Sequence, residues 1–273
     1  MDMLPASRAA TPSPQRAVGE GWFRAGPGVA LERLHQSGSA KIRFCRTEDN
    51  TREAVLLNTA GGLAGGDRFA WGVDLVEGAR CRVVTQACEK VYRAASDDPA
   101  SVAVRIDLAA GASLEWLPQE TILFEGARLE RRFDVRLAPG ARLLATEAVV
   151  LGRHAMGETA IRARLRDRWR VQWGERLIFA DELRLDAGPS TAGRPALLRD
   201  AAAFALVLLI AEDAEAVLDA VLQVLGDNGG ASAWDGKLIC RIATADARDL
   251  RQTLMAVMAA LRGGALPPRL WTV

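Results

Sequence analysis

Side chains suited to acid–base catalysis are scarce in this sequence. Its 273 residues include two histidines, His35 and His154, and three lysines, and neither an HExxH nor an HxxxH pattern occurs. No order of serine, histidine and aspartate stands out either. A chain with so few groups that titrate near neutral pH has little capacity for proton transfer. The sequence therefore predicts a protein that is not an enzyme.

Cysteine is also rare, and its spacing fits neither a dense disulfide framework nor a common metal motif. Cys45, Cys81, Cys88 and Cys240 form no CxxC pair. Reduced thiols in a cytoplasmic protein are the simplest explanation. The cysteines then serve as small buried hydrophobic groups, and thiolate ligation by Cys81 and Cys88 is the alternative.

Strong net charge and long apolar runs are missing as well. The formal net charge is +1, which provides no overall basic field for nucleic acid. The longest apolar run, 201–211, is shorter than the ~20 residues that cross a bilayer, so no membrane partner is expected. Residues 1–19 contain three prolines and no apolar signal segment. They are predicted to form a disordered N-terminal tail.

From residue 20 to residue 186 the sequence predicts a β-rich core of successive short strands. Apolar and polar residues alternate along 102–108 and around Phe133, as in strands with one buried face. A Gly-Ala turn recurs at Gly78, Gly111 and Gly140, which are 33 and then 29 residues apart. A repeat of this length favours stacked coils. A plain β-sandwich with repeated hairpins is the alternative.

The pattern changes in the C-terminal part, 187–273. A buried strand is expected at 203–210, and an amphipathic helix at 212–225 begins with acidic residues, as helices often do. A second strand is expected at 238–243 and a second helix at 245–262. The predicted fold is mainly β, with stacked sheets of β-helix-like coils and a C-terminal α/β portion carrying two helices, packed as a single structural unit.

Two glycine pairs, Gly61-Gly62 and Gly65-Gly66, followed directly by Asp67, predict a tight loop. A phosphate-binding loop is excluded because a carboxylate follows the last glycine where such loops carry lysine. A dinucleotide-binding loop is excluded because the following residues alternate like a strand. On chemistry alone, a structural turn in a β protein is the simplest interpretation of this loop.

The string LNTAGGLAGGD, then TQACEKVYRA and LGRHAMGE, resembles the urease accessory protein UreD family (UreH in some species) over most of 22–273. The resemblance implies a β-rich scaffold that binds apo-urease and UreF, while UreF recruits the GTPase UreG, which brings nickel. It also implies that the ion passes through an internal polar channel. The residues carried by these motifs, taken as structural, are Gly61, Gly62, Gly65, Gly66, Lys90, Tyr92, Arg93, Gly152, Arg153, Gly157 and Glu158.

A transient nickel(II) route through Asp67, Thr85, Glu89 and Glu147 is the sharpest hypothesis for a site. Oxygen ligands bind weakly enough to release an ion along a path. Glu147 lies between apolar neighbours, where a carboxylate must be paired, hydrogen-bonded or on a metal. The alternatives are a salt bridge for Glu147 and a turn-stabilising role for Asp67. No tightly bound cofactor is expected.

The segment 151–158 places His154, Met156 and Glu158 close together, and imidazole suits nickel. The motif, however, is built on its Leu-Gly-Arg and Gly-Glu parts. Arg153 and Glu158 are therefore expected to hold the shape of the segment or to meet a partner, and His154 as a ligand is the weaker alternative.

Arginine occupies every second position from 162 to 170, at Arg162, Arg164, Arg166, Arg168 and Arg170. On a strand these side chains share one face. They either protect an exposed edge or face from aggregation or dock an acidic patch on a protein partner. RNA binding ranks third, because no aromatic side chains interleave on that face.

Two other functional classes stay open at this point. One is a metal-free assembly scaffold that only shifts the conformation of urease. The other is a carbohydrate-active enzyme on a β-helix, which requires two acids converging in an open groove.

Overall fold

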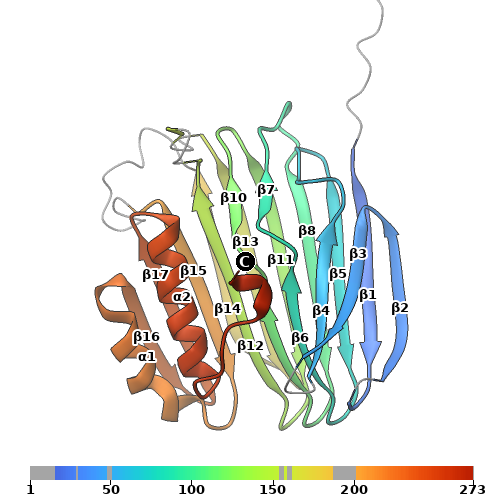
Figure 1. Cartoon of the computed structure of the whole chain (residues 1–273), viewed down its shortest axis with the longest axis vertical. Helices are drawn as coiled ribbons and strands as arrows, with labels where there is room; N and C mark the ends of the chain where they lie inside the picture. The colour runs from blue at the N-terminus through green and yellow to red at the C-terminus, as the bar shows by residue number, and fades with distance from the viewer. Residues whose placement is uncertain are drawn as a thin grey trace, which may run out of the picture.

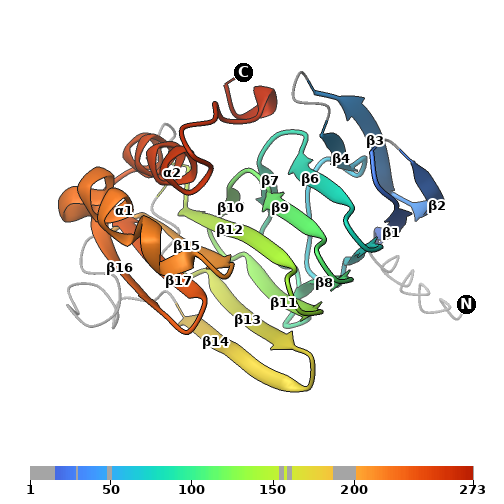
Figure 2. The same cartoon turned by 90° about the horizontal axis from the view of Figure 1, so that it is seen from below.

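Two β-sheets face each other, and two helices cover the outer side of one sheet (Figures 1 and 2). The computed structural model describes residues 16–28, 30–47, 51–153, 157–158, 162–186 and 201–272. The strands are β1 (Val18–Ala25), β2 (Leu31–Gly38), β3 (Ala40–Arg46), β4 (Arg52–Asn58), β5 (Arg68–Leu75), β6 (Arg80–Thr85), β7 (Glu89–Val91), β8 (Ala100–Leu108), β9 (Ser113–Leu117), β10 (Thr121–Leu123), β11 (Arg128–Leu137), β12 (Arg142–Leu151), β13 (Arg164–Trp173), β14 (Arg176–Asp186), β15 (Ala203–Ile210), β16 (Gly229–Trp234) and β17 (Lys237–Thr244). The helices are α1 (Leu218–Leu225) and α2 (Ala247–Leu261).

The middle of the chain winds as stacked coils. The seven-stranded sheet has the order β14-β13-β11-β8-β5-β1-β2, and its five central strands run parallel. The ten-stranded sheet contains the parallel run β12-β9-β6-β4. Because β5, β8 and β11 alternate along the chain with β6, β9 and β12, each coil adds one strand to each sheet. This confirms the predicted β-rich fold of stacked coils and excludes repeated hairpins as the source of the Gly-Ala turns.

The repeated glycines form a column of turns at one end of the coils. Gly78, Gly111 and Gly140 have φ angles of 67°, 63° and 72°, which glycine adopts without the strain that a Cβ causes. Neighbouring turns are hydrogen-bonded: Gly78 N donates to Ala110 O at 3.1 Å, and Arg142 N donates to Ala112 O at 2.8 Å. The turns therefore pair like the strands that they connect.

The space between the sheets is filled by the inward residues of both. Phe133 and Trp169 stack at 4.3 Å between ring centroids, and Trp116 of the opposite sheet lies 5.7 Å from Phe133. A second apolar layer lies between the ten-stranded sheet and the helices and includes Leu209 and Val257. Apolar burial of this extent is the main source of stability in such a fold.

The C-terminal part extends the ten-stranded sheet through β15, β17 and β16 and lays both helices over it. Asp246 caps α2 by accepting a hydrogen bond from Asp249 N at 2.9 Å. The two expected helices are present, but the first half of the segment 212–225 contains a 3₁₀ turn instead of α-helix. Strand β16 was not predicted, because its Gly-Gly-Ala-Ser-Ala sequence has low β propensity.

The ordered chain starts earlier than expected. β1 begins at Val18, inside the range assigned to the N-terminal tail, while 1–15 lie outside the described residues. The linker expected after Asp186 falls on 187–200, which also lie outside them. Neither α1 nor α2 nor any other described helix has the length and apolar character that a bilayer crossing requires.

Candidate functional site

The three motifs that are far apart in the sequence lie side by side at the end of the coils opposite the glycine turns. Leu63 of the glycine loop bridges to Val91, Val91 pairs with Leu123 of β10, and Leu123 pairs with Leu151 at the end of β12. All four side chains are buried. One residue of each motif therefore belongs to the same short run of parallel backbone pairs, in which β10 lies between β7 and β12 (Figure 1).

The glycine loop fits closely over the segment that carries Tyr92. Gly62 has a φ of 144°, and a Cβ there would lie 2.8 Å from Lys90 O. Leu63 N donates to Lys90 O at 2.7 Å, and the Tyr92 hydroxyl donates to Gly61 O at 2.9 Å. A Cβ at Gly65 would lie 2.6 Å from Asp98 O. These glycines are needed because backbone passes over backbone.

The third motif contains an ion pair, and both of its members contact the residues that follow β10. Arg153 Nε contacts Glu158 Oε2 at 2.5 Å, and the Arg153 guanidinium lies 4.5 Å from the centre of the Phe124 ring. Glu158 Oε1 accepts a hydrogen bond from Glu125 N at 2.8 Å. Gly152 and Gly157 adopt positive φ, and Arg93 pairs by a backbone bridge with Ala127. His154 and Met156 lie outside the described residues.

A narrow cavity of about 60 Å³ lies between the two sheets next to this run of parallel pairs. Three of the four residues predicted for an ion route line it: Thr85, Glu89 and Glu147. Thr85 Oγ1 accepts a hydrogen bond from Gln119 N at 2.9 Å, and Asn58 Nδ2 donates to Glu89 Oε1 at 3.2 Å. The structure thus brings Thr85 and Glu89 close to Glu147, which is far from them in the sequence.

Glu147 belongs to a buried network with one arginine and a second carboxylate. Arg131 Nη1 donates to Glu147 Oε2, and Arg131 Nη2 and Nε donate to Asp167 at 2.6 and 3.1 Å. Trp116 Nε1 donates to the other Glu147 oxygen at 3.2 Å. All three charged side chains are less than 10% exposed. The network holds one positive and up to two negative charges.

A second cavity, of about 180 Å³, lies on the other side of this network. Arg131 and Glu147 line both cavities, whereas Asp167, Asp181 and Arg241 line only the second. Asp181 pairs with the half-exposed Arg241 at 2.9 Å. Acidic groups therefore follow one another from Glu89 through Glu147 to Asp181, between the sheets.

Burial raises the pKa of Glu147 to about 7. The Arg131 guanidinium partly offsets this rise, and the nearby Asp167 adds to it. The same two carboxylates raise the pKa of Arg131, although burial alone opposes its charge. Glu147 is thus a buried carboxyl group that titrates near neutral pH.

Asp67 does not line either cavity. Its Oδ2 accepts a hydrogen bond from Ala64 N and its Oδ1 accepts one from Ala17 N, both at 2.7 Å. The carboxylate is buried and closes the turn after Gly66. Its contacts are those of the turn-stabilising alternative, and they tie the start of β1 to the glycine loop.

Glu89 gives the protein a specific pH dependence. Burial raises its pKa to about 7, against the hydrogen bonds from Asn58 and the Lys90 backbone. The folded state therefore keeps this proton at a pH where the unfolded chain has lost it, and the stabilising contribution disappears as pH rises through 7. Between pH 5 and pH 8, Glu89→Gln is expected to lose about 2 kcal/mol less unfolding free energy than wild type.

Urea unfolding of both proteins at several pH values measures this difference. Glu77→Gln, at an exposed turn, removes the same charge without the burial and serves as the control. Parallel stability curves for wild type and Glu89→Gln contradict the assignment.

The prediction that all four cysteines are buried holds for Cys81 and Cys240, whereas Cys88 is partly buried and Cys45 is exposed. Burial raises the pKa of Cys81 to about 12 and that of Cys88 to about 11. Cys88 lies against Glu120, with Sγ 3.3 Å from Oε2. Among the described residues no group of three or more His, Cys, Asp or Glu side chains is arranged to hold a metal ion.

The arginine row lies on the outer face of the seven-stranded sheet, but β13 is not an edge strand, because β14 pairs with it. Arg162 pairs with Glu125 at 2.7 Å, Arg164 with Asp186 at 3.2 Å, and Arg166 with Glu182 at 2.8 Å. The first three members of the row therefore form salt bridges within the chain, and Arg166 shares Glu182 with Arg184.

Arg131 and Asp167 were missed by the sequence reasoning, although a signal was present. Both stand in the inward phase of their strands, Arg131 between Leu129 and Phe133 and Asp167 between Leu165 and Trp169. A charged residue in a buried phase needs a partner. The register of the sheet supplies this partner, because Arg131 on β11 is directly opposite Asp167 on β13.

Comparison with known proteins places the chain among urease accessory proteins. The UreD urease accessory protein family model matches residues 22–272. The chain is 49% identical to the urease accessory protein UreD of Rhizobium leguminosarum bv. viciae, over 97% of this chain and 98% of that protein. It is 45% identical to UreD of Mesorhizobium japonicum over the full length of both, and 44% identical to UreD of Chelativorans sp. over 98% and 99%.

Proposed function

The chain belongs to the UreD urease accessory protein family and has a role in urease maturation, and from this premise we propose that it delivers nickel(II) to urease. The ion moves along the acidic side chains between the two sheets. The observation that carries this proposal is the position of Glu147, which is buried and lines both cavities.

The chemistry of the lining fits an ion in transit. Carboxylate and hydroxyl oxygens hold nickel less tightly than imidazole does, and weak sites in series let an ion leave as readily as it enters. Thr85 and Glu89 supply oxygens in the first cavity, Glu147 at the junction, and Asp167 and Asp181 in the second.

We also infer that the protein works as a cytoplasmic scaffold without catalytic activity. Apo-urease and UreF bind it directly, and UreG joins through UreF. Family membership and the three motifs support this assignment. The acids named above are enclosed between the sheets, whereas a β-helix carbohydrate-active enzyme needs its pair in an open groove.

One observation favours a second candidate, a scaffold that carries no metal and only shifts the conformation of urease. The Arg131 guanidinium lies between Glu147 and Asp167, where its charge and bulk oppose a cation. Under the nickel proposal this side chain has to move when the partners bind.

Calorimetric titration of nickel into the protein, alone and with UreF, separates the two candidates. We expect saturable binding that releases protons at pH 7, because a cation displaces protons from Glu89 and Glu147, whose pKa values burial raises to about 7. Repeating the titration in two buffers with different ionisation enthalpies counts those protons. A scaffold without metal gives no saturable heat, yet it still co-purifies with urease on co-expression.

A further inference from the structure

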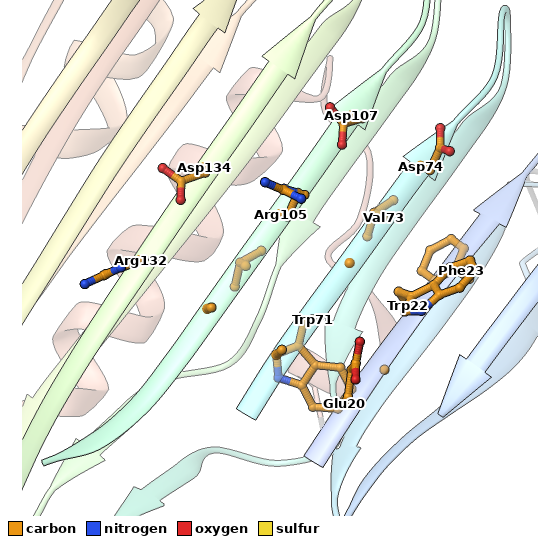
Figure 3. A pocket seen from close by; sticks show the side chains of 15 residues that line it. Glu20, Trp22, Phe23, Trp71, Val73, Asp74, Arg105, Asp107, Arg132 and Asp134 are labelled. Carbon is orange, nitrogen blue, oxygen red and sulfur yellow. The ribbon is translucent and has the colours of Figure 1, made fainter. Parts of the chain in front are cut away.

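The outer face of the seven-stranded sheet carries a hollow of about 500 Å³ (Figure 3). No described helix or strand lies over this face (Figure 2). Its floor consists of the smallest outward residues, Ala70, Gly72 and Ala103, which stand on β5 and β8. Trp22 forms one wall, and a Cβ at Gly72 would lie 2.7 Å from its Cβ. The hollow therefore has room for an apolar side chain beside an indole.

Four outward arginines lie on the opposite side of the hollow and beyond it: Arg105, Arg132, Arg168 and Arg170. None of them forms a salt bridge with another residue in the part of the chain that the structure describes. The Nε of Arg168 is buried without a hydrogen-bond partner. Figure 3 shows Arg105 and Arg132 across from Trp22.

Carboxylates on this face do not cancel the arginine charge. Asp74 is held by Arg24 at 2.9 Å, and Asp107 lies 4.0 Å from Arg136. Asp134 is directly opposite Arg105 and Arg170 in the register of the sheet, but among the described residues neither Asp134 nor Glu130 lies within salt-bridge distance of the four arginines. The excess charge on this side is positive.

The arginines are also placed at a cost to stability. Arg132 stands directly opposite Arg168 across the parallel pair β11 and β13. Like charges in this position repel, and neither arginine forms a salt bridge among the described residues, although Glu182 is directly opposite Arg168 on β14. Arg164 and Arg166, on the same face of β13, are relieved by Asp186 and Glu182. This like-charge pair lies beside the hollow, because Arg132 lines it.

We propose that this face binds an acidic segment of a protein partner in urease maturation, with an apolar side chain in the hollow and carboxylates over Arg105, Arg132, Arg168 and Arg170. The proposal rests on the assembly role given above. Of the arginine row, the proposed surface uses only Arg168 and Arg170, which form no salt bridge among the described residues. It adds Arg105 on β8 and Arg132 on β11. Charge complementarity of this kind steers association and fixes register.

A nucleic acid fits the same face poorly. Its phosphates need a continuous basic track, and Glu20, Asp74 and Asp107 interrupt the face on the other side of the hollow. Trp22 is the one aromatic side chain that faces outward there, and it is stacked on His35 at 5.9 Å. A protein segment that combines carboxylates with one apolar side chain matches the arginines on one side of the hollow and Trp22 on the other.

The test compares two double charge reversals on purified full-length protein. R132E/R168E is expected to weaken binding to apo-urease or to the UreF protein at least ~10-fold and to reduce its salt dependence. R164E/R166E, on the same strand and face, is the matched control and is expected to bind within ~3-fold of wild type. Affinities are measured by biolayer interferometry at two salt concentrations, with circular dichroism to verify the fold.

The single variant R132E adds a readout that a structural role does not produce. It replaces a like-charge pair by an ion pair with Arg168, so its melting temperature is expected to rise while its affinity falls. Unchanged affinities for R132E/R168E, or equal losses in both double variants, overturn the surface. If R132E/R168E loses binding to a ribonucleotide oligomer but keeps its affinity for the protein partners, the face binds RNA and the proposal is wrong. If wild type binds neither urease nor UreF, the assembly role fails together with the surface.

Discussion

Arg131→Met is expected to lower the free energy of unfolding by about 3–5 kcal/mol. The guanidinium is the only described cation in contact with Glu147 and Asp167, and both carboxylates are nearly buried. Removing it leaves two negative charges facing each other in a medium of low dielectric constant. Urea unfolding measures the loss, and the loss is expected to grow as pH rises, because the carboxylates then lose their protons.

The neighbouring residue provides the control. Arg132 is one position along β11 and points to solvent, so Arg132→Met is expected to change stability by about 0.5 kcal/mol or less. Adding Glu147→Gln and Asp167→Asn to Arg131→Met removes the uncompensated charges and is expected to restore most of the stability. Equal effects at 131 and 132 contradict a buried network.

Glu147→Ala is expected to leave the complex with urease assembled and to lower the nickel content of co-expressed urease ~10-fold or more. Glu147 is the one carboxylate that lines both cavities. Without it Arg131 keeps only Asp167 as a partner, and the junction changes from net negative to neutral. A cation then loses both a ligand and the field that admits it.

Nickel per urease active site, measured by elemental analysis after co-purification, reports the effect. Glu147→Asp keeps a carboxylate and is expected to retain more nickel than Glu147→Ala. Glu77→Gln removes an exposed carboxylate at a turn, outside both cavities, and controls for a general loss of acidity. Full nickel loading with Glu147→Ala removes this residue from the route.

Alternation and turn chemistry were enough to predict most of the fold. The strand 203–210 and the three Gly-Ala turns follow from local pattern, because one face of each strand is buried and each turn needs a left-handed residue. Strand β16 was not predicted, because its pairing with β17 stabilises it and its own side chains do not. The 3₁₀ turn before α1 is likewise set by its packing against the sheet.

The site was harder to predict because it depends on register and on contacts between sheets. Burial of Glu147 followed from its apolar neighbours, but its partner Arg131 lies on the other sheet, and no local pattern joins the two strands. The split of the arginine row also depends on the pairing of β14. This pairing puts Asp186 directly opposite Arg164. Glu182 is directly opposite Arg168, but its carboxylate pairs diagonally with Arg166.

The column of hydrogen-bonded turns at Gly78, Gly111 and Gly140 constrains how this architecture can grow or shrink. Duplication or deletion of one complete coil, from turn to turn, preserves every backbone partner in both sheets. An insertion shorter than a coil finds no partner in either sheet and has to project as a loop. The breadth of the two sheets, and with it the length of the proposed ion route between them, therefore changes by whole strands.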